Sequence, residues 1–456
     1  MRENRIVINP FGVISLLDYK GMQQANEHGY VELSAMIRNE QKDTYLAQAR
    51  ENTWVEVLAY GENDQKNTLF CGILTEFCIH EEGEVPILHL RLETGSRLMD
   101  YEQHTRSFQK ESYSYKEIAE VCNEGYTDAG MIMPEGREKT AGQFIMQYRE
   151  TDWNFLKRMA SCLNTVVIPA SNVKGVKYFF GIPEKEENME SEAEGYSTSR
   201  ELAERSGKGV TVTTYILEQR EYYSLGAKVL FQNQELHIWK IKSFLRGNEL
   251  IHRYYLRKKE DFYVPRYYQD EMTGASLFGK VEAVEGEQVK VALDKDENQQ
   301  CGSRWFDFST VYSSPDGAGW YCMPETGDSV RLYFPTEDEA DAYVSSAFHE
   351  NQGDGLRVNP QNKIWRNKQG KEIRLTPDKI LMTNNQGMSV ELADGSGIRI
   401  ISSGSVQIEA SDQISISSAN GNLNMTAANK VLLKQGSTRL ELSEDIRLSG
   451  GKIHMQ

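Results

Sequence analysis

The last quarter of the chain repeats one small pattern: two apolar side chains separated by a single residue and followed by polar residues. From Val390 to Ile414 the first members of these pairs are eight residues apart, and after Ile414 they are six to nine residues apart. Because side chains two residues apart lie on the same face of a strand, each pair predicts one short strand with an apolar face. A near-constant period of this kind indicates units that are stabilised by stacking on their neighbours. The pairs are Ile373/Leu375, Ile380/Met382, Val390/Leu392, Ile398/Ile400, Val406/Ile408, Ile414/Ile416, Leu423/Met425, Val431/Leu433, Leu440/Leu442, Ile446/Leu448 and Ile453/Met455.

Two inward side chains per strand are too few to close a core within one chain. A single-chain β-solenoid uses roughly twenty residues per coil, whereas one repeat here makes about one side of a triangle. We therefore predict that three identical chains each contribute one side, which buries every pair along a shared axis. The composition agrees, because no Phe, Tyr, Trp or Cys follows Trp365 and a narrow axis has no room for rings. The predicted trimer core consists of Val390, Leu392, Ile398, Ile400, Val406, Ile408, Ile414, Ile416, Leu423, Met425, Val431, Leu433, Leu440, Leu442, Ile446 and Leu448.

Two other interpretations of the repeat stay open. One is a single-chain parallel solenoid, and the other is an amyloid-like or disordered low-complexity tail. Charged turns such as "EASDQ" and "LSEDI" argue against the tail.

The composition of all 456 residues limits the function. A net charge of −16 disfavours binding to nucleic acid or to anionic lipid surfaces. Six cysteines without CxxC spacing predict reduced, mostly buried thiols. No apolar stretch reaches the ~18 residues that span a bilayer, and the start "MRENRIVINPFGV" lacks the apolar core of a signal peptide. We expect synthesis and assembly in the cytoplasm, and exit from the cell would then need a machine that carries the protein or lysis of the cell.

The rest of the chain predicts a mainly β fold with a small α/β portion. Segments such as "WVEVLAYG" (54–61) alternate apolar and polar residues, as half-buried strands do. Ser114 and Glu117 form a capping-box pattern at the start of one helix, and Thr151 or Asp152 caps a second. The predicted domains are a first β-barrel (1–95), an α/β insertion with an acidic loop (96–209), a second β-barrel (210–270), an OB-fold barrel (275–348), a neck (349–379) and a trimeric β-prism (380–456).

Several long segments resemble the VgrG-type spike proteins of contractile injection systems, which are similar to the fused hub and central spike of contractile phage tails. The segments are "FCGILTEF", "LETGSRLMDYEQHTRSFQKESYSYKEIAEVC", "QYRETDWNFLKRMASCLN", "YYSLGAKVLFQNQELHIWKIKSFLRGNELIHRYYL", "GWYCMPETGDSVRLYFPTEDEADAYVSSAFHE" and "NKQGKEIRLTPDKILMTNNQGMSVEL". The resemblance implies a homotrimer at the tip of the inner tube, where it adapts a threefold spike to a sixfold tube of inner-tube protein hexamers. It also implies contacts with baseplate proteins, an effector cargo, a separate PAAR-like tip protein and a transient contact with the target membrane, which the spike punctures on contraction.

We predict no cofactor and no catalytic residue, because residues 349–379 are too few for the lysozyme insert that some relatives of this family carry. Some phage spikes bind iron through an HxH pair near the apex, but this chain has only His454 there, so we predict no metal. We expect the tip protein to contact Ile453, His454 and Met455. The alternatives to a structural spike are a tail-associated cell-wall-degrading enzyme and a solenoid carbohydrate-binding protein or adhesin.

Overall fold

The computed structural model describes residues 5–60, 66–83, 85–189, 195–205, 208–349 and 357–452. It divides the chain into two compact units, Met1–Glu350 and Asn351–Gln456. Both units consist mostly of antiparallel strands, so the predicted mainly β fold class with a small α/β portion is confirmed.

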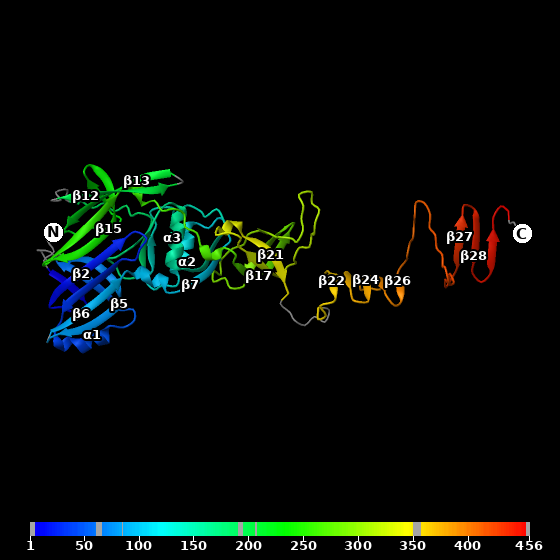
Figure 1. The fold of residues 1–456 in the computed structure, drawn as a ribbon, viewed down its shortest axis with the longest axis horizontal. Coiled ribbons are helices and arrows are strands. Elements are labelled where there is room, and N and C mark those ends of the chain that lie inside the picture. The colour runs from blue at the N-terminus through cyan, green and yellow to red at the C-terminus, as the bar shows by residue number, and fades with distance from the viewer. Residues whose placement is uncertain are drawn as a thin grey trace. The chain divides into compact units, whose positions relative to one another are not determined.

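The first unit is built around one 11-stranded sheet with the order β1-β4-β5-β6-β3-β2-β15-β16-β13-β12, in which β14 pairs with β15 (Figure 1). Pairing of β2 with β15, from Lys20↔Phe244 to Gln24↔Lys240, joins the strands near the start of the chain to those after residue 195. The strands are β1 (Arg5–Asn9), β2 (Ser15–Gln24), β3 (Tyr30–Met36), β4 (Trp54–Tyr60), β5 (Lys66–Glu82), β6 (Val85–Glu93), β12 (Tyr196–Arg205), β13 (Lys208–Gln219), β14 (Lys228–Phe231), β15 (Gln234–Arg246) and β16 (Glu249–Arg257).

Each half of this sheet covers its own apolar core. One core lies under β1 to β6 and includes Val57, Phe70 and Leu90. The other includes Ile238 and Tyr254. The sequence predicts that the second hub barrel begins at residue 210. In the structure β12, which lies before that residue, pairs with β13 along its whole length, so both strands belong to the same half of the sheet. We therefore keep the six-part division as a proposal, with the second set of hub strands beginning at Tyr196.

The α/β portion has the two helices that the sequence predicts. Helix α2 (Tyr115–Asn123) begins after Ser114, whose hydroxyl accepts from the Glu117 amide while the Glu117 carboxylate accepts from the Ser114 amide. Helix α3 (Asp152–Cys162) begins after Thr151, whose hydroxyl accepts from the Asn154 amide. The strands of this portion are β7 (Gln103–Phe108), β8 (Gly130–Ile132), β9 (Ile145–Thr151), β10 (Val167–Pro169) and β11 (Lys177–Phe180). A further short helix, α1 (Lys42–Gln48), lies between β3 and β4.

A five-stranded barrel follows, with the order β19-β18-β17-β20-β21. A parallel bridge between Phe308 and Val344 joins its two ends, which is the closure expected of a small OB-like barrel. Its core also contains Phe144 and Met146, which come from the α/β portion. The strands are β17 (Ser276–Glu285), β18 (Gln288–Leu293), β19 (Phe306–Asp307), β20 (Ser329–Tyr333) and β21 (Tyr343–Phe348).

Buried ion pairs fasten this barrel to helix α3. The Arg158 guanidinium lies 3.0 Å from Glu150 and 2.9 Å from Glu339, which sits in the short 3-10 helix η5 (Glu339–Asp341) between β20 and β21. Burial lowers the pKa of Arg158, but the two carboxylates outweigh burial, so its pKa is raised. Burial also raises the pKa of Glu150 despite the neighbouring Arg158. Losing any member of this cluster would leave a buried charge without its partner.

The cysteines are free thiols, as predicted, but most are not buried. Cys71 and Cys122 are buried, whereas Cys162 and Cys301 are half-buried and two others, Cys78 and Cys322, are exposed. The expectation of mostly buried thiols is therefore wrong, because strand alternation in β5 turns Cys78 outward.

The second unit contains two thin sheets of short strands. The first has the order β22-β23-β24-β25-β26 and the second has the order β27-β28-β29. The strands are β22 (Lys363–Arg366), β23 (Glu372–Leu375), β24 (Lys379–Thr383), β25 (Ser389–Ala393), β26 (Gly397–Ile401), β27 (Val431–Gln435), β28 (Thr438–Leu442) and β29 (Ile446–Ser449).

Candidate functional site

The apolar pairs of the repeat line up on one face of the sheet β22–β26. The register places Ile373, Met382, Val390 and Ile400 opposite one another on successive strands. The second members follow the same rule, because Leu375 pairs with Ile380, Ile380 with Leu392, and Leu392 with Ile398. Every strand from β23 to β26 thus presents two apolar side chains to the same side, which we call the apolar face.

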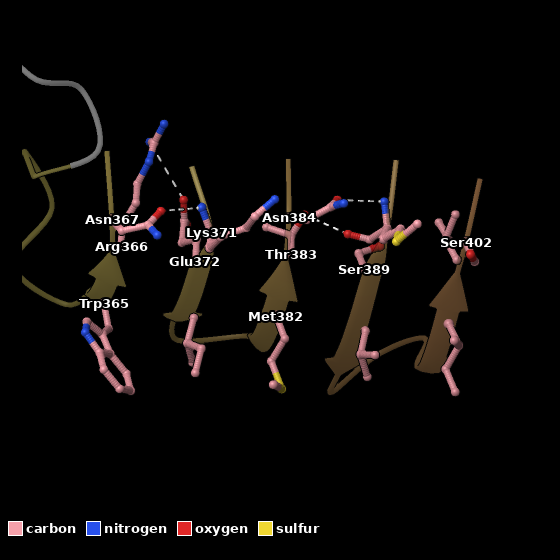
Figure 2. Close-up of a pocket in the computed structure, with 15 residues that line it drawn as sticks. Trp365, Arg366, Asn367, Lys371, Glu372, Met382, Thr383, Asn384, Ser389 and Ser402 are labelled. Atoms are coloured by element: carbon pink, nitrogen blue, oxygen red, sulfur yellow. Dashed lines mark hydrogen bonds and ion pairs between the residues drawn. The ribbon is translucent and has the colours of Figure 1, made fainter. Parts of the chain in front are cut away.

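This apolar face has no cover within the described residues. Ile398 is 73% exposed and Ile400 is 62% exposed, although isoleucine is a residue that folded proteins usually bury. Figure 2 shows Trp365 and Met382 in one row across the strands, with the polar residues Asn367, Lys371, Asn384 and Ser402 in a second row beside it. A groove of about 560 Å³ is lined by both rows. Such a contiguous apolar surface is typical of an interaction site.

The opposite face of the same sheet carries charged residues. Glu372, which is buried, pairs with Arg374 and lies 3.8 Å from Arg366. Lys379 lies 3.0 Å from Glu391 on the neighbouring strand. In the turn before β24 the Thr376 hydroxyl donates to Asp378 at 2.7 Å and lowers the pKa of that carboxylate. The opposite face is therefore the more polar of the two, although it also carries Leu381 and Ile401.

The sheet β27–β29 repeats this arrangement. Val431 pairs with Leu442 and Leu442 with Ile446, so the three lie in one row. Leu433, Leu440 and Leu448 form a second row on the same face. Both rows contain exposed members, with Ile446 at 74% exposure. The apolar pairs therefore form a face in both sheets of this unit.

Between the two sheets the structure differs from the prediction of one strand per pair. Residues 402–430 form no strand in the single chain, although all of them are described. No backbone–backbone hydrogen bond joins residues 405–430 to other described residues. The pairs Val406/Ile408, Ile414/Ile416 and Leu423/Met425 are exposed, with Ile408 at 68%. A five-residue strand needs a neighbour for its backbone groups, and here the chain supplies none.

The predicted tip contacts Ile453, His454 and Met455 lie outside the described residues. Within the described ranges no group of three His, Cys, Asp or Glu side chains is placed to hold a metal ion. The helices of the described part are too short and too polar to span a membrane.

One constellation with the residue types of a hydrolase was not found from the sequence. His28 Nδ1 lies 2.8 Å from Ser96 Oγ, and His28 Nε2 lies 2.8 Å from Asp100 Oδ2. Ser96 is fully buried, and the ring of Trp153 lies 5.0 Å from the His28 ring. A substrate could not reach this hydroxyl without local unfolding, so the cluster is a packed hydrogen-bond network rather than a nucleophilic site.

Comparison with solved structures finds this fold in proteins of contractile machines. The E. coli c3393 protein, a component of the type VI secretion system with structural similarity to T4 bacteriophage tail proteins gp27 and gp5, is 12% identical at a TM-score of 0.55, over 76% of this chain and 100% of that chain. The half-lidded Francisella PdpA-VgrG complex is 9% identical at a TM-score of 0.56, over 87% of each chain. The lidless complex is 9% identical at a TM-score of 0.55, over 84% of this chain and 93% of that chain.

Neither the comparison with protein-family models nor the comparison with curated proteins gives a match. The predicted resemblance is nevertheless confirmed where it concerns structure, because the structural likeness extends over most of the chain. The chain has a VgrG-like hub-and-spike fold.

Proposed function

We propose that this protein is the central spike of a contractile injection machine and that it works as a homotrimer. The observation that carries the proposal is the uncovered apolar face of β22–β26 and β27–β29, together with the lack of backbone–backbone hydrogen bonds from residues 405–430 to other described residues. The VgrG-like fold supports the same conclusion, since the c3393 protein of that fold is a component of the type VI secretion system.

The width of the strands favours three copies over two. Strand β25 has five residues and therefore spans about 15 Å, of which only Val390 and Leu392 face the apolar side. Two such narrow sheets placed face to face would leave both long edges of the apolar layer open to water. Three sheets close a prism around one axis and bury the predicted core residues from Val390 to Leu448. Burial of each side chain stabilises the assembly by about 1.5–3 kcal/mol.

In this proposal residues 405–427 become strands only in the trimer. Neighbouring chains supply the hydrogen-bond partners that the single chain lacks, and Ile408 and Ile416 then face the axis. Continuous pairing around the prism would make the needle stiff, as in other closed β structures. A stiff, narrow needle can transmit the force of sheath contraction to a target envelope, and this role is mechanical rather than enzymatic.

The first unit would hold the needle on the inner tube. Three copies of the 11-stranded sheet, each with two halves and two cores, would present six halves, which suits an adaptor between a threefold spike and hexamers of the tube protein. Baseplate proteins, an effector cargo and a PAAR-like protein at Ile453, His454 and Met455 are the further proposed partners.

The test is the mass of the purified full-length chain in solution, measured by light scattering. We expect the mass of three chains. The mass of a single chain, with the C-terminal region still rich in β-structure by circular dichroism, would contradict the proposal and favour a single-chain solenoid.

A further inference from the structure

A hairpin arm extends from the five-stranded barrel between β19 and β20. The arm, residues 309–323, folds back on itself at Pro315, Asp316 and Gly317, and its two sides pair antiparallel at Ser313 and Gly319. The Trp320 amide donates to the Tyr312 carbonyl at 2.8 Å, and the Ser314 amide donates to the Ala318 carbonyl at 2.8 Å. The arm is therefore an ordered element and not a structureless loop.

The arm exposes large apolar side chains on both of its faces. Tyr312 lies across from Trp320 on one face, and Val311 and Tyr321 lie on the other, because residues that flank the Ser313–Gly319 bridge alternate in direction. Val311 is 94% exposed and Trp320 is 64% exposed. An isolated two-stranded hairpin is marginal in water, so a hairpin with two uncovered apolar faces indicates a missing partner.

A second uncovered surface lies on the outside of the same barrel. Phe278 on β17 and Phe348 on β21 are 43% and 44% exposed. The Arg331 guanidinium on β20 stacks on both rings, at 4.9 Å from Phe278 and 5.3 Å from Phe348. Lys280 is a neighbour on the same face, since it pairs with Ser329 in the register that pairs Phe278 with Arg331. We call Phe278, Lys280, Arg331 and Phe348 the Phe278 patch.

In its own chain the arm does not cover this patch, because both rings of the patch stay exposed. Its base is fixed near the β17–β18 turn, where the Tyr321 hydroxyl donates to the Gly286 carbonyl at 2.9 Å. Phe278 lies seven residues from the end of β17 at Glu285, which is about 23 Å along an extended strand. Each barrel thus carries two uncovered surfaces at different places.

The two surfaces are complementary in chemistry. The arm holds aromatic rings and one charged residue, Asp316, whereas the patch holds two rings and the cations Lys280 and Arg331. Tyr and Trp rings pack well against an arginine that is already stacked on aromatic side chains. The single charge of the arm, Asp316, is opposite in sign to the two cations, so the contact adds no like-charge repulsion between chains with a net charge of −16.

We propose that the arm of one chain packs on the Phe278 patch of the next chain, so that the five-stranded barrels of three copies form a closed ring. A contact between two different surfaces of identical chains is head-to-tail, and such contacts close into rings when the rotation permits. This inference rests on the proposed trimer and adds a second interface, outside the needle, that holds the three copies together.

The test joins the two surfaces covalently in the full-length protein. Cys322 on the arm is exposed, and Ser346, the register partner of Arg331, is an exposed position for a second thiol. A Ser346→Cys variant in a Cys78→Ser background is treated with a short bis-maleimide. We expect covalent dimers and trimers on a denaturing gel. The matched control is Lys295→Cys in the same background, at an exposed position in the turn after β18, and we expect it to remain uncrosslinked.

A Trp320→Ser/Tyr321→Ser variant gives a second readout. We expect it to lose the crosslink to Ser346→Cys while light scattering still gives three chains, because the needle remains intact. A trimer whose Ser346→Cys variant crosslinks no better than Lys295→Cys would overturn the arm contact and leave the proposed function standing. A single-chain mass for the unmodified protein would overturn both.

Discussion

The two units of this chain differ in what each can bury by itself. Residues before 350 enclose four apolar cores in which residues such as Phe70, Phe155, Tyr254 and Phe306 are fully covered. In the second unit the apolar residues from Ile380 to Leu448 are largely exposed, although they are as regularly spaced as any core strand. Regular patterning therefore specifies which face of a strand is apolar, but the number of side chains on that face decides whether one chain can bury that face by itself.

The most severe test of this difference between the units is a charged residue on the apolar face of the second unit. Ile416→Asp would bring three like charges onto the proposed axis, where the desolvation cost is several kcal/mol per ion. We expect loss of the trimer, measured as a fall in mass to that of a single chain. Ser415→Asp, one residue away on the opposite face, is the matched control and should remain trimeric.

A trimeric Ile416→Asp protein would mean that this side chain does not face the axis. The same experiment with Ile408→Asp and Gln407→Asp extends the test to a second repeat.

The first unit allows the converse experiment, because the buried charge of Arg158 has its ion-pair partners within the same chain. Arg158→Met leaves Glu150 and Glu339 buried without their cation, and we expect a loss of about 3–5 kcal/mol in the free energy of unfolding of this unit. Chemical denaturation followed by Trp fluorescence measures the loss. Arg137→Met, at an exposed position, should change stability by less than about 0.5 kcal/mol. Equal effects of the two substitutions would contradict the role assigned to Arg158.

Dilution of the protein distinguishes the behaviour of the two units without any mutation, because only folding that requires association depends on protein concentration. No aromatic residue follows Trp365, so near-ultraviolet circular dichroism reports almost entirely on the first unit, whereas the far-ultraviolet signal reports on both. A needle that folds only by association should melt at a lower temperature in dilute solution, while the near-ultraviolet transition stays in place. A far-ultraviolet transition that is independent of concentration would indicate a needle that folds within one chain.

The smallest expected effect is a pH dependence in the first unit. His89 Nε2 lies 2.8 Å from His80 Nδ1, and burial followed by the charge of His80 lowers the pKa of His89 from 6.5. A histidine with a lowered folded pKa contributes stability that is present above 6.5 and is lost as the pH falls below that value. We expect a slightly lower melting temperature at acidic pH, and a weaker pH dependence in His80→Gln. An unchanged dependence in that variant would assign it to other groups.

Local patterns in the sequence predicted the local structure well. The Ser114–Glu117 capping box and the Thr151 cap both begin helices as expected, because a cap depends on residues within one turn. The apolar pairs likewise share a face wherever strands form, since alternation is a property of the strand itself.

Distant contacts were not predicted. The pairing of β2 with β15 and the ion pair of Arg158 with Glu339 join residues far apart in the sequence, and no local pattern encodes such contacts. The arm at 309–323 was missed because its apolar residues are too few to form a period. The strands expected at residues 405–427 are absent from the single chain, and under the proposed trimer their formation requires neighbouring chains.

The unpaired backbone of residues 405–430 also affects how the protein is made. The first unit can finish folding while the ribosome is still producing the remainder, since its cores need no other chain. In the proposed trimer, the repeat segment that follows stays exposed to proteases until two further chains associate with it. Under the proposal, the yield of intact protein therefore depends on whether association of the three chains is faster than degradation of the exposed segment.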